Sequence, residues 1–421
     1  MNAHATTVDR TARCPIAVAA GFGFLLVLVL ARTSLAQGFD SGSDGRHGDY
    51  APEAGAGVVL FDPTDFADVT DNIFHFESIT IPTGTTVRLG ASLLGEGRPI
   101  VWLARGPVVI DGAIDLDGAP GHAYFEPEAV SEAGAGGFGG GRGNLNPGNG
   151  PGGGGVAVNS HGGGAGHNGA GEAFGDAAGG PGYGDGFLVP LLGGSGGGGG
   201  AYCNNQFAGG GGAGGGALLL ASSASIDLAG TIRARGGTGG TRAFNGCGGG
   251  GGSGGGIRLV APEVRGAGLL DVTGGGPPPG GPSVFHRGAP GRIRVEAARK
   301  RFTFTATPLQ AMRIASPGAV FPRGTPSVRV TRIAGIDAPA TPGGDAARPD
   351  LSLSVNGETM LEIEASGIPP GTVVRLTINP EDSQARVILS SALAGTLERS
   401  TATAAVTLPF GVSRWIVTAA W

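Results

Sequence analysis

Three aspartates follow one another closely in the segment VVIDGAIDLDG: Asp111, Asp115 and Asp117. Closely spaced carboxylates are what a hard cation such as Ca²⁺ requires. A calcium-dependent polysaccharide lyase combines such acids with a basic residue that takes a proton from the substrate. Arg233 and Arg235 are the candidates for that base. Structural ion pairing between these arginines and the aspartates is the simpler interpretation, and we favour it.

The strand segments that contain these residues belong to a repeat, described below, and alignment of its copies places most of these charges on the outward face of the strands. If the segments stack in sequence order, equivalent residues of neighbouring parallel strands lie about 4.8 Å apart. The two rows of equivalent outward residues are Asp115, Arg233 and Asp271, and then Asp117, Arg235 and Thr273. The charges alternate in sign along the first row and from Asp117 to Arg235 in the second, and a slip of one residue would turn them into the core. We therefore predict an ion ladder that specifies the register of the stack, and not a catalytic cluster.

A second group of polar residues lies in NSHGGGAGHNGAGEAFGD. Its members His161, His167, Glu172 and Asp176 have the residue types that bind transition metals or calcium. Their spacing matches no common metal motif, so we interpret them as polar loop residues. No metal site is predicted there.

Three further aspartates, Asp40, Asp44 and Asp49, lie among glycines near the start of the chain. Acids at this density suit a calcium loop, but they match no EF-hand spacing and lack its terminal glutamate. Short Asx turns are the favoured interpretation. No cofactor is predicted, and calcium is the one that these acidic groups leave open.

The first 36 residues have the pattern of a secretory signal peptide. Arg10 and Arg13 precede the apolar run Ile16–Ala31, and Ser34-Leu35-Ala36 offers the small residues that a signal peptidase reads before Gln37. An uncleaved anchor is disfavoured, because the run falls short of the roughly 20 residues that cross a bilayer. The sequence thus predicts a secreted or cell-surface protein with no membrane span after cleavage.

Two cysteines, Cys203 and Cys247, remain once Cys14 leaves with the signal peptide. An even number of cysteines in an oxidising compartment favours pairing. Each cysteine lies shortly before an apolar run, at Ala217 and Ile257, so neighbouring repeats would bring the two together. We predict a structural disulfide. Two free buried thiols, or a metal pair with additional ligands, are the alternatives.

The recurring unit is a glycine run, a short apolar run, a turn and an alternating strand. Four copies align on Ala104, Ala221, Ala261 and Ala297. Apolar residues at every second position predict strands with one buried face, and roughly 20 residues is about one coil of a β-solenoid. The inward pairs of this alignment are Ile100 and Trp102, Ala217 and Leu219, Ile257 and Leu259, and Ile293 and Val295.

Glycine accounts for 88 of the 421 residues and crowds between Gly134 and Gly291, without the third-residue spacing of collagen. The segment 118–216 interrupts the coil pattern but contains an apolar island at 187–192. Leu218 and Leu220 face outward in the alignment and are apolar. We therefore predict a layer of glycine-rich chain on that face, because glycine lets backbones approach closely.

After Arg301 the glycine runs stop, and short alternating strands with conventional turns follow, beginning with RFTFTATPL. This succession of short alternating strands and turns predicts an immunoglobulin-like β-sandwich. The predicted fold is all-β, a right-handed parallel β-helix (solenoid) with long glycine-rich insertions followed by a β-sandwich domain. The predicted parts are the signal peptide 1–36, an entry segment and first coil 37–98, the glycine-rich β-helix 99–300 and the sandwich 301–421.

Three strings carry a resemblance to a known family. FDSGSDG, the passage from IFHFESITIPTGTTVRL to IVWLARGPVVIDGAIDLDGAPG, and YGDGFLVPLLGGSGGGGG are similar to exported bacterial glycine-rich proteins of unknown function. The resemblance covers nearly all of the mature chain. It implies a right-handed parallel β-helix with glycine-rich insertions, often followed by a small β-sandwich, and it implies no catalytic residue.

Two function classes follow. The favoured one is a secreted or cell-surface structural or adhesion-type protein without catalytic activity, with a cell-surface or matrix polysaccharide as the partner considered. The alternative is a calcium-dependent carbohydrate-active enzyme, lyase-like, or a carbohydrate-binding protein that uses a solenoid face. Such sites need exposed aromatic platforms or converging carboxylates, and Trp102, the one aromatic residue in the aligned strands, points inward. A net charge of −5 argues against a nucleic-acid partner.

Overall fold

The computed structural model describes residues 38–69, 71–126, 129–144, 146–203, 207–241, 246–277, 286–322, 324–340, 342, 349–355, 357–380 and 386–421. The predicted signal peptide, with Cys14, lies outside these residues. The protein is nearly all β, with 3% of residues helical and 37% in strands. Within the described ranges, no helix is long and apolar enough to cross a membrane.

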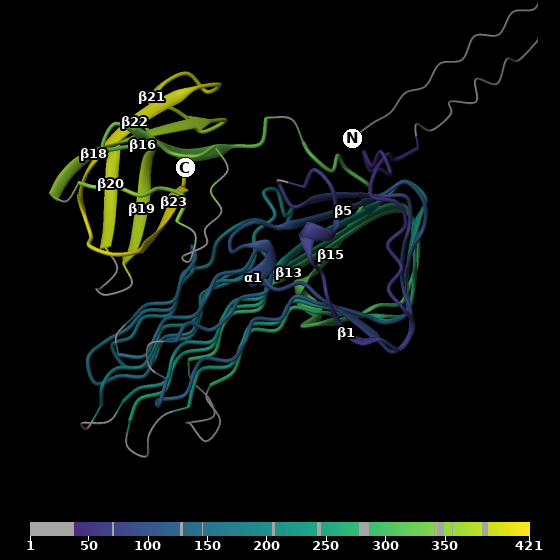
Figure 1. Cartoon of the computed structure of the whole chain (residues 1–421), viewed down its shortest axis with the longest axis horizontal. Helices are drawn as coiled ribbons and strands as arrows, with labels where there is room; N and C mark the ends of the chain where they lie inside the picture. The colour runs from purple at the N-terminus through teal and green to yellow at the C-terminus, as the bar shows by residue number, and fades with distance from the viewer. Residues whose placement is uncertain are drawn as a thin grey trace, which may run out of the picture. The chain divides into compact units, whose positions relative to one another are not determined.

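Parallel strands form the first part of the fold, and they lie in rows to which successive chain segments add one strand each (Figure 1). One sheet is a single row. Its strands, in spatial order, are β1 (Gly57–Leu60), β4 (Thr85–Arg88), β7 (Ala113–Asp115), β10 (Thr231–Arg233), β12 (Leu269–Asp271) and β14 (Thr305–Thr307). Spatial order therefore follows sequence order along this row.

The second parallel sheet contains two more rows, which join at a long strand, β11 (Gly256–Gly266). The first half of β11 pairs with β8, and its second half pairs with β9. One row contains β2 (Ile73–Phe76), β5 (Ile100–Ala104), β8 (Ala217–Ser222), β11, β13 (Arg292–Phe302) and β15 (Met312–Ala315). The other contains β3 (Ile79–Ile81), β6 (Val108–Ile110) and β9 (Ser225–Leu228). The parallel array is nearly closed.

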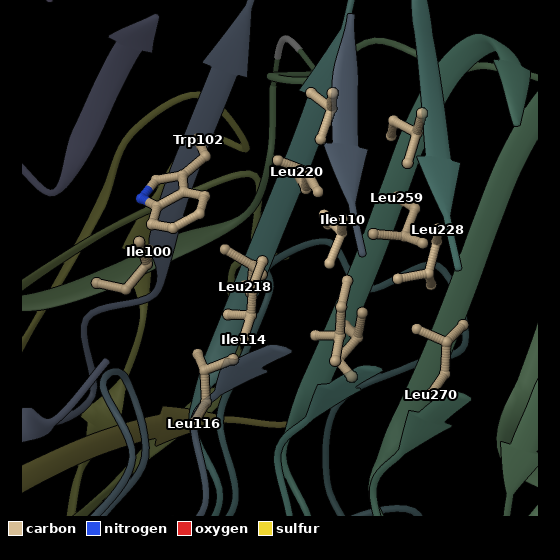
Figure 2. Packing of buried hydrophobic residues seen from close by; sticks show 14 of the residues in the cluster. Ile100, Trp102, Ile110, Ile114, Leu116, Leu218, Leu220, Leu228, Leu259 and Leu270 are labelled. Atoms are coloured by element: carbon tan, nitrogen blue, oxygen red, sulfur yellow. The ribbon is translucent and has the colours of Figure 1, made fainter. Parts of the chain in front are cut away.

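The core of this array consists of side chains that lie level with one another on neighbouring strands. Trp102 pairs in register with Phe74 on one side and Leu220 on the other. Leu220 in turn pairs with Leu259. Figure 2 shows Trp102, Leu220 and Leu259 pointing into the same apolar cluster, and all three are fully buried. Each added strand therefore extends continuous columns of apolar side chains.

The predicted register of β8 is wrong by one residue. Leu218 and Leu220 lie in the core, level with Ile100 and Trp102, whereas the alignment placed Ala217 and Leu219 there. Ala104 accordingly pairs with Ser222 and not with Ala221. Alternation fails at this strand because every residue of β8 is buried. A strand that is apolar on both faces gives no pattern from which its register can be read.

The opposite face of β8 is covered by the apolar island of the glycine-rich segment. Leu188 and Leu191 form a second buried cluster with Leu219, Leu103 and Val101. The predicted covering layer therefore exists, but it packs on Leu219 where the alignment had named Leu218 and Leu220. A layer on this face explains why β8 needs no polar side.

The glycine-rich segments form few strands, and each bonds to several neighbouring segments through its backbone. In segment 209–217, amides three residues apart donate to the same neighbour. The donor–acceptor pairs for the three neighbours are Gly209–Cys247, Gly212–Gly250 and Gly215–Ser253; Gly210–His122, Ala213–Ala119 and Gly216–Leu116; and Gly211–Gly141, Gly214–Phe138 and Ala217–Ala135. Three residues per turn is the repeat of a polyproline II helix, which has no internal hydrogen bonds and leaves its amides free for neighbours.

These glycine-rich segments lie side by side (Figure 1, teal to green traces), and they are packed too closely to admit a side chain. A Cβ atom added to Gly212 would collide with the carbonyl oxygen of Gly237, and one added to Gly214 would collide with that of Gly194. Buried backbone groups need partners, and glycine allows three neighbours to supply them at once. The glycine content is therefore a packing requirement of an ordered bundle.

Antiparallel strands form the second part of the fold, and they begin after the parallel pairing has ended at β15. A five-stranded sheet has the order β17-β16-β18-β22-β21, and a three-stranded sheet has the order β20-β19-β23. Their bounds are β16 Ser327–Ile333, β17 Ile336–Asp337, β18 Gly357–Ser366, β19 Val373–Pro380, β20 Arg386–Ala392, β21 Ala394–Gly395, β22 Ser400–Leu408 and β23 Ser413–Ala419. Leu361, Leu376 and Val406 belong to one buried cluster that both sheets share.

The predicted strand RFTFTATPL lies in the parallel array, where its residues belong to β13 and β14. Alternation is the same in parallel and antiparallel strands that bury one face, so the sequence pattern did not distinguish the two. Short helical turns complete the described elements. They are η1 (Pro63–Asp65), α1 (Ala91–Leu94) and η2 (Leu309–Ala311).

A neighbouring pair of glycines tests the packing requirement. A Cβ at Gly275 would collide with the carbonyl oxygen of Gly237, whereas a Cβ at Gly276 meets nothing within 4 Å. We expect Gly275→Ala to lower the free energy of unfolding by about 1–3 kcal/mol, because backbones must separate. Gly276→Ala should be neutral or stabilise by up to about 1 kcal/mol, because it restricts the unfolded chain. Denaturant titration measures both, and equal effects would contradict the packing account.

Candidate functional site

The predicted ion ladder lies on the single-row sheet. Arg233 on β10 pairs in register with Asp115 on β7 and with Asp271 on β12, as the alignment predicts. Its side-chain ion pairs are with Asp115 at 2.9 Å and with Asp117 at 3.0 Å. Arg233 therefore reaches diagonally to Asp117, whereas we had expected it to bridge Asp115 and Asp271.

The second row of the ladder contains several hydrogen bonds between Arg235 and the carboxylate of Asp117. Both Nε and Nη2 of Arg235 donate to Asp117, at 3.0 and 2.7 Å, and the backbone amide of Arg235 donates to the same carboxylate. Arg235 Nε also lies 4.0 Å from Asp271. The side chains of Thr273 and Asp271 bond to each other at 2.9 Å. All six predicted members thus lie in one continuous polar strip.

The sequence analysis missed a further member, Arg88. It pairs in register with Asp115 and donates to its carboxylate at 3.0 Å. The run TTVRL contains the signal, because Val87 alternates inward with Arg88 outward, but the first coil had not been aligned with the others. Asp115 therefore lies between two guanidinium groups.

The electrostatics of the ladder favour fixed charges. Burial raises the pKa of Asp115, but hydrogen bonds from Arg233 and the Asp117 amide, with the charge of Arg88, outweigh burial and hold it below the ordinary value. The hydrogen bond to Asp115 raises the pKa of Arg233, and that to Asp117 raises the pKa of Arg235. Both arginines stay protonated, so neither suits the role of general base.

A second ion cluster, which the sequence analysis did not identify, is buried on β11 and β13. Glu296 accepts from Arg258 at 2.9 Å and from Arg294 at 2.7 Å, and Arg258 and Glu296 are 3% and 1% exposed. Burial raises the pKa of Glu296, but the two arginines outweigh it and the pKa is lowered. The amide of Gly318 donates to Glu296, and Arg258 donates to the carbonyl of Ala319. The cluster therefore fastens the chain that leads out of β15.

The histidines of the predicted polar loop are buried among glycine-rich segments. His161 Nδ1 accepts from the amide of Gly248, and its ring contacts Phe174. His167 is 1% exposed, stacks on Tyr183, and has Nδ1 2.6 Å from the carbonyl oxygen of Gly254, so Nδ1 carries the proton. Glu172 accepts from the amide of Arg287. These residues are structural partners of the backbone.

The remaining acidic residues that the sequence analysis considered lie outside the strands. Asp40 accepts from the amide of Gly42 and Asp44 from that of Arg46, which are the predicted Asx turns, and Asp49 accepts from the hydroxyl of Ser78. Asp111 and Asp176 are exposed. Among the described residues, no group of three or more His, Cys, Asp or Glu side chains is placed to hold a metal ion.

The predicted disulfide is confirmed: Cys203 is bonded to Cys247, with the Cα atoms 5.6 Å apart. The backbone amide of Gly209 donates to the carbonyl of Cys247, so the two glycine-rich segments are adjacent at that point. The bond ties together two hairpins of the glycine-rich bundle.

Comparison of the chain with protein-family models, curated proteins and solved structures finds no match. Functional inference therefore rests on the chemistry of the residues described above.

The disulfide yields a prediction for the purified protein under non-reducing conditions. Its intact mass should rise by two hydrogens on reduction, and alkylation before reduction should label neither Cys203 nor Cys247. The paired Cys203→Ser, Cys247→Ser variant should lose about 4 kcal/mol of unfolding free energy, because the bond spans 44 residues and restricts the unfolded chain. Labelling of both thiols without reductant would contradict the bond.

Burial of His167 yields a pH dependence. Burial lowers the pKa of His167 from 6.5 to about 4. The unfolded chain takes up this proton at higher pH than the folded chain, so the stabilisation is complete above about pH 6.5 and is lost as the pH falls towards 4. The loss should approach about 3 kcal/mol.

Chemical denaturation at pH 7 and pH 4.5 measures this loss. His167→Asn should flatten the pH dependence, since its amide can still donate to Gly254, and His122→Gln, at a more exposed position, serves as the control. An unchanged slope in His167→Asn would contradict the assignment.

Proposed function

We propose that the parallel rows are coils of a right-handed β-helix and that the two antiparallel sheets form an immunoglobulin-like β-sandwich. Support comes from the order of strands, because each segment adds one strand to each row before the next begins. Connections between parallel strands of one sheet are right-handed in nearly all proteins. The two antiparallel sheets share one apolar cluster, as the layers of a sandwich do.

We propose that the protein is an exported structural or adhesion-type protein without catalytic activity, held in a secreted or cell-surface location. The observation that carries this proposal is that the polar groups described above are engaged in structural hydrogen bonds and ion pairs. The ladder carboxylates are neutralised by arginines, His161 and His167 bond to backbone groups, and the amides of the glycine-rich bundle bond to neighbouring segments. Such a chain is suited to holding a rigid shape outside the cell.

The alternative, a calcium-dependent lyase, finds less support in the same residues. A cation at Asp115 and Asp117 would have to displace the guanidinium groups of Arg88, Arg233 and Arg235. Arginines whose pKa is raised by these acids do not accept a substrate proton readily. The resemblance to exported glycine-rich proteins agrees with the structural role.

Two measurements test the proposed function. Cell fractionation of the native producer should find the mature chain, beginning near Gln37, in the medium or on the cell surface. Incubation with a panel of acidic polysaccharides, with and without Ca²⁺, should generate no unsaturated product absorbing near the wavelength of a conjugated uronate. A cytoplasmic location, or calcium-dependent formation of unsaturated product, would overturn the proposal.

A further inference from the structure

Several hairpins of the glycine-rich bundle end at the same place. Gly210 donates to His122, and Gly240 donates to Gly210. Gly200 donates to Gly209, and Tyr124 donates to Thr241. The described residues 122–126, 200–203, 207–210 and 240–241 are therefore neighbours at one end of the glycine-rich bundle.

This end carries exposed aromatic side chains in a part of the chain otherwise built from small residues. Tyr124 and Phe125 are 37% and 69% exposed, and Tyr202 and Phe207 are 47% and 54% exposed. They form two pairs, with ring centroids 5.5 Å apart in the first and 5.8 Å apart in the second. We call these four residues the aromatic end.

The aromatic end is held by covalent and backbone bonds. Cys203, next to Tyr202, is bonded to Cys247 of the adjacent hairpin. The amide of Tyr124 is fixed on Thr241, and His122 Nδ1 lies 3.0 Å from Glu126. Preorganised rings lose little conformational entropy on binding, which favours recognition through few contacts.

The size of the exposed surface discriminates between partners. At roughly 200 Å² per aromatic side chain, the exposed fractions leave about 400 Å² of ring surface in the four residues. A stable protein interface buries about 800 Å² on each partner. The aromatic end offers about half of that area, which is the scale of an exposed patch with a function of its own.

We propose that the aromatic end binds a neutral polysaccharide by stacking its rings on the C–H faces of pyranose units. The tyrosine hydroxyls supply hydrogen bonds at the ring edges. The charged side chain that the structure describes beside these rings, Glu126, is hydrogen-bonded to His122, and the exposed surface of the four residues is mainly ring carbon, which suits an uncharged partner. The inference rests on the proposed function and moves the binding surface from the solenoid face to the end of the glycine-rich bundle.

The test uses the full-length exported protein on an array of neutral polysaccharides that includes glucans, mannans, galactans and chitin. Wild-type protein should bind at least one of them without Ca²⁺. Two double variants should each bind at least tenfold more weakly. One combines Tyr202→Ala with Phe207→Ala, and the other combines Tyr124→Ala with Phe125→Ala. Their melting temperatures should match wild type, because the rings lie outside the buried clusters.

The control substitution is Phe410→Ala, which removes a ring that is 80% exposed in the antiparallel part. It should leave glycan binding unchanged, and Tyr124→Phe with Tyr202→Phe should retain most of it through stacking. Glycan binding that survives both double substitutions would overturn the aromatic end while the exported adhesion-type role stands. The polysaccharide inference would be overturned if the wild type binds no member of the array. It would also be overturned if the rings instead mediate binding to neutral phosphatidylcholine vesicles or self-association of the protein. A cytoplasmic location or lyase product would instead overturn the proposed function.

Discussion

Contact between backbones with no side chain between them is the constraint on which this structure depends. Each glycine-rich segment donates amide hydrogens to as many as three neighbours with a repeat of three residues. A Cβ atom at Gly212, Gly214 or Gly275 would collide with a carbonyl oxygen of the next segment. Glycine loses more entropy on folding than other residues, so a bundle of this kind must recover that cost through hydrogen bonds and covalent ties.

The bundle and the parallel strands support one another. The chain leaves β7 into a glycine-rich segment, and later segments return directly into β8 and β11. Leu188 and Leu191, carried by the glycine-rich chain, cover the face of β8 that the core does not use. Charged residues pair on the faces that the core does not use: the ladder lies along the outer face of the single-row sheet, and Glu296 with its arginines bonds to the chain after β15.

The sequence predicted the elements whose two faces differ. Ile232 is flanked by polar residues on β10, so alternation fixed its register with Ile114 and Leu270 and brought Arg233 beside Asp115. The same logic failed at β8, where both faces are apolar. The glycine-rich segments, whose hydrogen bonds repeat every three residues, gave no sequence pattern, because glycine has no side chain to mark a face. The aromatic end was equally hidden, since its rings come from hairpins that are distant in sequence and meet through the backbone.

Amide hydrogen exchange in the segment formed by residues 194–201 and 209–216 tests the central claim most directly. The account predicts that amides of this segment exchange more slowly than in an unstructured glycine peptide by on the order of a thousandfold or more, because their hydrogen bonds break only when the fold opens. Protection should extend through both of these stretches without the alternation of an edge strand, since successive amides bond to different neighbours. Exchange at the rate of the unstructured peptide would contradict an ordered glycine-rich bundle.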